Sequence, residues 1–393
     1  MRKSIPDSSR RNGVAGRCDR GDRVHRFFIG VTGVGLLLTF FFWLMYRTGV
    51  PLFRHPGSLA ILLLPLAFGW LQVYGADSPL PLPLLRGLAY AGGYWLAFFH
   101  YSLYVLILYG LLRLGMAAVN AAHPGLLAVS AIGAPYVRVA FAVVVLLVAA
   151  GGWNALHPRI RMVDFDTGGR LKKPQTIVLV TDMHLGSLFG RSYAAELTEK
   201  INGQHPDVVL FGGDLVDNRL CWVEREQSHE PLRNIRSTYG VYAVRGNHDH
   251  LDQRVEAEEA LFRSIGFRFL VDQAVDLPNG LHITGLEDYR SRPVNPYLAS
   301  LAGTDPHSVR ILMEHQPRRF WEACNAGYDI YVAGHTHAGQ QAPLNLITKR
   351  MYLLDSGTRL FGSLLGVVSN GYGLWGSPVR VGNRPELVVL KLR

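Results

Sequence analysis

Charged residues are scarce in this sequence, and so are cysteines. Lys, Arg, Asp and Glu make up 18% of the 393 residues, compared with about 25% in a typical soluble domain, whereas 49% of the residues are hydrophobic. This shortage, together with a mean hydropathy of +0.13, predicts that part of the chain lies outside water. The three cysteines, Cys18, Cys221 and Cys324, are too few and too widely spaced for a disulfide framework or a zinc finger.

The net charge of +10 is confined to the first 160 residues. These contain 14 Lys and Arg but only 4 Asp and Glu, whereas residues 161–393 contain 26 basic and 26 acidic residues. A nucleic-acid-binding domain carries its positive charge on a folded, polar surface. Here the excess accompanies the hydrophobic part of the chain, where basic residues report on membrane orientation. We therefore expect the lipid bilayer, and not nucleic acid, as a partner.

Four apolar stretches predict an all-α transmembrane region. They cover about 27–46, 59–74, 88–112 and 137–153. The first is long enough to span about 30 Å of hydrocarbon as a helix, and it is too long for a signal peptide. We expect a basic tail over 1–26, a transmembrane region over 27–155 and a separate domain over 161–393. His100, inside the third stretch, is expected to make a helix-packing hydrogen bond, with an intramembrane functional site as the alternative.

Basic residues also predict which side of the membrane the C-terminal half occupies. A cluster of them before the first span keeps the N-terminus in the cytoplasm, and four spans return the C-terminal half to the same side. An odd number of spans would place it on the opposite side, and the short 59–74 stretch decides the count. The cluster consists of Arg2, Lys3, Arg10, Arg11, Arg17, Arg20, Arg23 and Arg26.

The C-terminal half has the pattern of an α/β domain. Residues 191–202 and about 223–237 have helical periodicity, and 372–392 alternates as closing strands do. Apolar runs bounded by turn residues predict buried strands, and each run ends in polar residues, where α/β sheets place functional groups. These runs are 177–180, 207–211, 241–244, 309–313 and 330–332.

The polar residues after these runs form a set of metal ligands. Carboxylates mixed with imidazoles suit Mn, Fe or Zn rather than Ca or Mg alone. Asp182 and His184 are two residues apart on an extended chain, so they point to the same side. Asp214 has two oxygens and can bridge two cations about 3.5–4 Å apart, as in two-metal hydrolysis. The full set is Asp182, His184, Asp214, Asn247, His315, His335 and His337.

Five motifs follow one another along this half: DMH at 182–184, GGDLVD at 212–217, GNHD at 246–249, His315, and GHTH at 334–337. With these motifs the chain resembles the calcineurin-like metallophosphoesterases over about residues 174–393. GHTHAGQ at 334–340 and GLEDYR at 285–290 are similar to the bacterial subgroup of the YkuE and YaeI phosphodiesterases, which includes membrane-anchored members. The resemblance implies an α/β fold, a four-layer αββα sandwich, with a dinuclear metal centre at its edge.

The resemblance also implies roles for individual residues. The first metal would bind Asp182, His184, Asp214 and His337, and the second would bind Asp214, Asn247, His315 and His335. A hydroxide bridging the two ions, Mn foremost with Fe or Zn as alternatives, would attack phosphorus in line. His248 would stabilise or protonate the leaving oxygen, and Asp249 would orient His248.

Some of these residues could also have ordinary structural roles. Asp214 alone could cap a helix, and Asn247 alone could be an ordinary turn residue. Asp217 is expected to shape the turn after Asp214 and is not assigned to metal. His250 is expected in a solvated loop, with a substrate contact as the alternative.

Residues outside the motifs receive structural roles. Arg290 and Arg292 would either contact a substrate phosphate or form surface salt bridges. The remaining histidines of this half are expected at the surface: His205, His229, His282 and His307.

The sequence therefore predicts a membrane-anchored, metal-dependent phosphoesterase, more specifically a phosphodiesterase, of a bacterial inner membrane. Tethering favours a lipid or lipid-linked phosphate as substrate. One alternative is a pyrophosphatase of the UDP-2,3-diacylglucosamine hydrolase type in lipid A synthesis, which needs a cytoplasmic site and an apolar groove. A cell-envelope polymer phosphodiesterase would need the opposite face. A non-catalytic membrane sensor with a phosphoesterase-like binding module would be expected to lack metal ligands, and none is missing.

Overall fold

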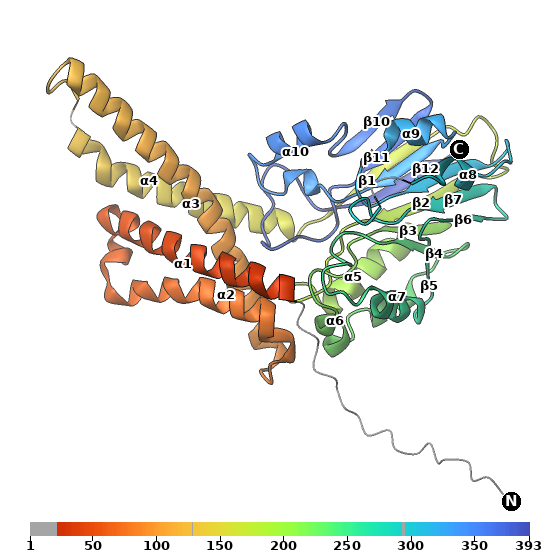
Figure 1. Cartoon of the computed structure of the whole chain (residues 1–393), viewed down its shortest axis with the longest axis horizontal. Coiled ribbons are helices and arrows are strands. Elements are labelled where there is room, and N and C mark those ends of the chain that lie inside the picture. The colour runs from red at the N-terminus through yellow and green to blue at the C-terminus, as the bar shows by residue number, and fades with distance from the viewer. Residues whose placement is uncertain (1–21, 128, 293–294) are drawn as a thin grey trace, which may run out of the picture.

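The computed structural model describes residues 22–127, 129–292 and 295–393, and it contains a helical region and an α/β domain (Figure 1). In the helical region, α1 runs away from the α/β domain and α4 returns to it. The α-helices are α1 (Asp22–Gly49), α2 (Leu63–Tyr74), α3 (Leu82–Ala122) and α4 (Val129–Ala155). The connections contain three 3₁₀ helices, η1 (Pro51–Arg54), η2 (Pro56–Leu62) and η3 (Gly75–Asp77).

Among the residues that the structure describes, two segments of this region are long and apolar enough to cross a membrane: α3, with 41 residues, and residues 133–155 of α4. In their most apolar windows, only 11% and 17% of the residues are buried inside the protein. A core helix of a soluble protein would have most of these side chains covered, so the helical region is membrane-associated. The 12 residues of α2 extend about 18 Å, so the 59–74 span requires η2 as well. The count of four spans stays a prediction.

The α/β domain contains two six-stranded sheets. The first has the order β1 (Arg159–Phe165), β12 (Glu386–Leu392), β2 (Gln175–Val180), β3 (Val208–Gly212), β4 (Val241–Val244) and β5 (Phe267–Phe269). The second has the order β10 (Gly357–Phe361), β11 (Leu364–Val368), β9 (Ile330–Ala333), β8 (Val309–Met313), β7 (Leu281–Gly285) and β6 (Gln273–Asp276). Strands β2 to β5 are parallel, as are β7, β8, β9 and β11, so their carboxyl ends meet at one edge.

The sheets pack face to face, and helices cover both outer faces. Alternation along β2 shows how the layers form: Ile177 and Leu179 point into the core between the sheets, whereas Val178 and Val180 point into a second core beneath helices. The order of layers is therefore helix, sheet, sheet, helix, which confirms the four-layer αββα sandwich. The covering helices are α5 (Arg191–Asn202), α6 (Leu220–Glu226) and α7 (Val255–Arg263) on the first sheet, and α8 (Leu298–Leu301) and α9 (Phe320–Asn325) on the second.

The predicted strands are β2, β3, β4, β8 and β9, with ends within two residues of the expected ones, and the predicted helix at 191–202 is α5. Two other predictions are wrong. Residues 223–237 do not form one helix, because the chain turns left-handed at Gln227 (φ 55°) and continues as η4 (Glu230–Asn234). In 372–392 only β12 is a strand, because the preceding residues wrap around the metal-ligand edge, where Gly373 N–H donates to Asp182 O at 2.8 Å.

The helical region is docked onto the α/β domain. Arg86, near the start of α3, forms an ion pair with Glu226 of α6 at 2.6 Å. Leu85 of α3 is fully buried in a cluster that also contains Trp222 and Leu374 of the α/β domain. Arg225 donates hydrogen bonds of 2.6–3.3 Å to the carbonyl oxygens of Gly75, Ala76, Ser78 and Leu80. The first turns of α3 are therefore held against the α/β domain.

Candidate metal centre

All seven predicted ligands lie just beyond the carboxyl ends of strands. The parallel arrangement brings these ends together, so residues as distant in sequence as His184 and His337, 153 positions apart, come into contact. Asp182 and His184 follow β2, Asp214 follows β3, Asn247 follows β4, His315 follows β8, and His335 and His337 follow β9.

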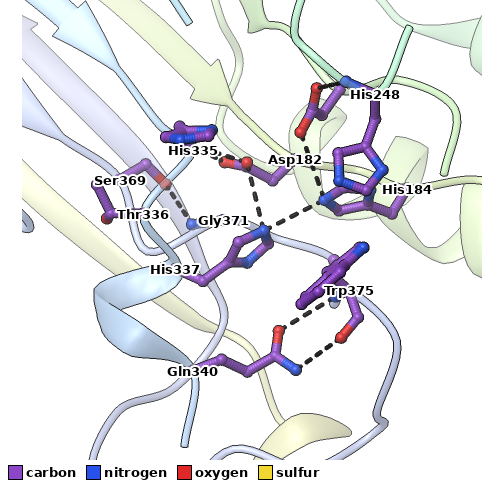
Figure 2. Close-up of polar contacts among 12 residues, drawn as sticks. Asp182, His184, His248, His335, Thr336, His337, Gln340, Ser369, Gly371 and Trp375 are labelled. Atoms are coloured by element: carbon purple, nitrogen blue, oxygen red, sulfur yellow. Dashed lines mark hydrogen bonds and ion pairs between the residues drawn. The ribbon is translucent and has the colours of Figure 1, made fainter. Parts of the chain in front are cut away.

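The first group of ligands contains Asp182, His184 and His337, all buried (Figure 2). His337 Nε2 lies 3.2 Å from His184 Nε2 and 3.4 Å from Asp182 Oδ1. Asp214 Oδ2 lies 3.8 Å from His184 Nε2, so this carboxylate reaches the group as well. The arrangement places two carboxylates and two imidazoles around one position.

The second group contains Asp214, His315 and His335. His315 Nε2 lies 3.1 Å from Asp214 Oδ2 and 3.3 Å from His335 Nδ1. Asn247 Oδ1 is buried and has no hydrogen-bond partner among the described residues, which is unusual for a buried amide oxygen. A cation would satisfy it. The donor set therefore fits two divalent transition-metal ions that share Asp214, although metal binding itself stays a prediction.

Five of the ligands have left-handed backbones. The φ angles are 54° at Asp182, 50° at His184, 53° at Asp214, 72° at His335 and 49° at His337. Non-glycine residues avoid this region, and such conformations concentrate at functional sites. Each turn bends the chain sharply at the end of a strand and directs the side chain into the shared edge.

Glycines allow the loops to approach one another. A Cβ on Gly246 would lie 2.2 Å from Asp214 Oδ1, and a Cβ on Gly334 would lie 2.3 Å from Asp182 Oδ2. No carbon atom can approach an oxygen this closely without displacing it. The glycines of the GNHD and GHTH motifs therefore make room for the two carboxylates.

Burial and neighbouring charges set the protonation states of the ligands. Burial acts to raise the pKa of Asp214, but the hydrogen bond and charge of His315, together with the charges of His248 and His184, hold that pKa well below its ordinary value. Burial lowers the pKa of His335 to about 3 and the pKa of His337 well below its ordinary value. The ionised Asp214 and the neutral imidazoles of His335 and His337 have the forms that coordinate metal. Burial acts to lower the pKa of His315, but Asp214 raises it to about 10, so His315 would have to lose a proton when a metal binds.

The surroundings of His248 differ in part from expectation. Its Nδ1 lies 2.5 Å from the carbonyl oxygen of Asp217, and its backbone N–H donates to Asp214 Oδ1 at 2.8 Å. Asp249 was expected to orient His248, but its carboxylate instead accepts hydrogen bonds from backbone N–H groups, including those of Asp214 and Gly246. The turn after His248 directs Asp249 into the interior, so Asp249 holds the backbone of two ligand loops together.

Three residues near the centre were missed or misjudged from the sequence. Asp217, expected only to shape a turn, places Oδ1 3.4 Å from His184 Nδ1 and 3.6 Å from His248 Nδ1. Glu258 is buried against Asp249, and both burial and that carboxylate raise its pKa well above the ordinary value. Arg380 is fully buried and donates to the carbonyl oxygen of His337 at 2.8 Å. Only Asp217 carried a sequence signal, because it ends the GGDLVD motif.

Residues outside the ligand set have mostly structural contacts. His250 Nε2 lies 3.1 Å from Glu287 Oε1, and Arg292 forms a salt bridge with Asp272. His229 and His282 were expected at the surface but are 2% and 4% exposed, respectively. His282 lies on β7 beneath α8, where Nε2 meets the carbonyl oxygen of Leu301 at 2.6 Å and Nδ1 meets Asp276 at 2.7 Å. His205 and His307 are exposed, as expected.

Replacing Gly246 by alanine tests the packing of the ligand loops. Because the new Cβ would overlap Asp214, we expect the Gly246→Ala protein to bind at least tenfold less Mn²⁺ than the unmodified protein. Metal content after gel filtration, measured by mass spectrometry, gives the result. Gly87→Ala on α3 is the control, since a Cβ there meets nothing within 4 Å. Equal metal content in both variants would contradict the shared position of Asp214.

The environment of Glu287 predicts that the free energy of unfolding depends on pH. Burial acts to raise its pKa, but His250, the backbone N–H of Asp288 and Arg245 lower it to about 2 from the ordinary 4.5. Ionised Glu287 therefore stabilises the fold above pH 4.5, and this contribution disappears as the pH falls towards 2. We expect Glu287→Gln to lower the free energy of unfolding by about 1–2 kcal/mol at pH 7, a value reduced for partial solvent exposure.

Urea denaturation followed by tryptophan fluorescence between pH 3 and pH 7 measures this difference. Glu196→Gln, which breaks only the exposed pair with Lys200, is the control. A difference between Glu287→Gln and the unmodified protein that stays constant over this range would show that Glu287 is not held ionised by its neighbours.

Comparison with known proteins agrees with this geometry. The family model for calcineurin-like phosphoesterases matches residues 175–339. An uncharacterized metallophosphoesterase of Campylobacter jejuni is 32% identical over 261 residues, which cover 63% of this chain and 67% of the relative. A relative in Helicobacter pylori is 32% identical over 230 residues, 57% of this chain and 61% of that protein, so this chain spans less than two thirds of its length.

A membrane region also occurs among the relatives. A transmembrane protein with metallophosphoesterase domain from Bos taurus is 32% identical over 241 residues, which cover 55% of this chain and 52% of that protein. Among solved structures, the Haemophilus influenzae NAD nucleotidase aligns over 51% of this chain and 46% of its own, with 12% identity and a TM-score of 0.34. The extent of the match to the C. jejuni relative, with the family model, shows that the chain belongs to the calcineurin-like metallophosphoesterase family.

Proposed function

We propose that this protein is a membrane-anchored, metal-dependent phosphodiesterase. The observation that supports it is the pair of ligand groups at one edge of the sandwich, with the buried carboxylate of Asp214 in one group and 3.8 Å from His184 of the other. Two bound divalent ions, Mn²⁺ foremost, would supply an activated water and neutralise the phosphoryl oxygens. Because no expected ligand is missing from the edge, a binding module that has lost its activity is the weaker explanation.

His248 is the proposed proton donor to the leaving oxygen. A carbonyl oxygen can only accept a hydrogen bond, so the contact of Nδ1 with Asp217 O requires a proton on Nδ1. This leaves Nε2 as the atom that donates in the protonated ring. The nearby Asp217 carboxylate stabilises that charge, since its Oδ1 lies 3.6 Å from His248 Nδ1.

The location of the site completes the proposal. The basic residues before the first span favour a cytoplasmic catalytic domain at a bacterial inner membrane. The docking of α3 onto the α/β domain supports a substrate presented at the bilayer, such as a lipid or lipid-linked phosphate ester. A reporter fused to the C-terminus would separate the cytoplasmic from the opposite orientation.

Asp214→Asn tests the activity. We expect the purified full chain to hydrolyse bis-p-nitrophenyl phosphate with added Mn²⁺, and Asp214→Asn to reduce the rate at least about 100-fold, since one ligand of both ions is weakened. Release of p-nitrophenolate measures the rate. Asp164→Asn, an exposed carboxylate on β1, is the control and should retain full activity. A folded, metal-loaded protein without hydrolysis under any transition metal would contradict the proposal.

His248→Gln tests proton donation. We expect a loss of about 10²–10⁴-fold in kcat for a diester with an alkyl leaving group, and a smaller loss for p-nitrophenolate, which leaves without needing a proton. The comparison uses a pair of diesters with these two leaving groups, and the metal content of the variant is checked in parallel. Equal losses for both leaving groups would show that His248 acts only by positioning.

A further inference from the structure

A cavity of about 490 Å³ connects the metal centre to the membrane region. Its lining includes His335 and His337 at one end and Leu96 and Phe99 of α3 at the other. Ile347 of α10 (Asn345–Met351) also lines it, as does Trp375. The cavity therefore has metal ligands on one wall and a membrane helix on another, and its volume is in the range of small-molecule sites.

Trp375 contributes an aromatic wall near the candidate centre, since its ring centroid lies 6.1 Å from that of His248 in an edge-to-face arrangement (Figure 2). Gln340 fixes the Trp375 backbone, with its Nε2 donating to Trp375 O at 2.9 Å and its Oε1 accepting from Trp375 N at 3.1 Å. Trp375 is nevertheless 50% exposed. A large apolar side chain is thus held open to solvent next to the candidate centre.

The α10 wall is also apolar and uncovered. None of its seven residues is buried, and Ile347 is 53% exposed. Apolar side chains concentrated around a concave surface usually contact a ligand. In Figure 1, α10 lies on the side of the α/β domain that faces the helical region, so its lining side can meet a molecule at the membrane.

The α3 wall belongs to the uncharged part of α3, where the helix packs against the α/β domain: a Cβ on Gly93 would lie 2.4 Å from Pro378. α3 has Arg86 and Arg113 as its only charged residues, and the segment between them is uncharged. Arg86 marks the aqueous end, since it pairs with Glu226 of the α/β domain. Leu96 and Phe99 lie 10 and 13 residues further along, about 15–20 Å up the helix. The cavity therefore opens beside the apolar part of α3.

His100 lines the cavity beside Leu96 and Phe99. Its Nε2 is buried without a hydrogen-bond partner among the described residues, and its ring packs edge-on against Tyr101 and Tyr104. The prediction that His100 makes a helix-packing hydrogen bond is therefore wrong.

We propose that this cavity binds the long apolar chain of an amphiphilic phosphate ester, whose phosphate lies at the metal edge. The inference rests on the proposed function and assigns α3 a binding role: it is a wall of the substrate site as well as an anchor. Continuity with the ligands requires a phosphate at one end of the occupant, and the walls of α3 and α10 require an apolar chain at the other. Each methylene buried there favours binding by up to about fourfold.

The test uses the full chain in lipid nanodiscs, so that detergent does not fill the cavity. The substrates are p-nitrophenyl phosphodiesters whose second ester is methyl or hexadecyl, and the readout is the ratio of their kcat/KM values. Ile347→Asp places a charge in the cavity, and Leu96→Trp fills part of it from α3. We expect each variant to lower the hexadecyl-to-methyl ratio at least fivefold.

The hexadecyl substrate also partitions into the bilayer, but this partitioning is the same for every variant. Matched controls therefore separate an effect of the cavity from an effect of partitioning. Leu346→Asp changes the next residue of α10, which is 52% exposed and does not line the cavity. Leu111→Trp makes the same replacement as Leu96→Trp on a distant, 61% exposed part of α3. Both controls should keep the ratio of the unmodified protein, and gel filtration with metal analysis verifies folding of all four variants.

The outcomes distinguish the two proposals. Hydrolysis of both esters with equal ratios in Ile347→Asp, Leu96→Trp and the unmodified protein would overturn the chain-binding cavity and leave the phosphodiesterase intact. Equal reductions in the control variants would also overturn it, since the effect would then not depend on the cavity. Absence of hydrolysis of either ester by metal-loaded protein would overturn the proposed function itself, and this inference with it.

Discussion

The structure depends on keeping the carboxylate of Asp214 ionised while it is buried. A buried carboxylate is costly unless cations or hydrogen-bond donors surround it. Here His315 lies 3.1 Å from Oδ2, and the backbone N–H of His248 donates to Oδ1. Asp249 in turn fixes the backbone N–H of Asp214. Loops from three strands therefore converge on one side chain, and the two ligand groups meet there.

This constraint explains the unusual backbone of the centre. Left-handed turns at five ligands and glycines at two contact points are each unfavourable in the absence of the assembled site. The sandwich stabilises them, because the core between the sheets and the cores beneath the helices hold the strand ends in place. Arg380 contributes from inside the domain, where its guanidinium donates to the carbonyl oxygens of His337, Asn370 and Gly373.

Prediction from the sequence succeeded where chemistry and local pattern coincide. The predicted ligands lie together in the structure because each follows a short apolar strand that ends at the same edge, and their order and spacing were enough to single them out. The role predicted for Asp249 was wrong, since the direction of a side chain in a tight turn depends on which loops pack against that turn. The burial of Glu258 and Arg380 could not be predicted from a sequence pattern, because a charged residue in an amphipathic helix or a loop is ordinarily exposed.

The sequence by itself determined the separation into an apolar, basic half and a neutral α/β half, and it was enough to predict the set of candidate metal ligands. These properties depend on composition and short-range spacing. Only the tertiary structure decided that α3 lies against the ligand edge and encloses a cavity with α10. Leu96 and Ile347 are 251 positions apart, and their proximity follows from the ion pair and the buried cluster that dock α3 onto the α/β domain.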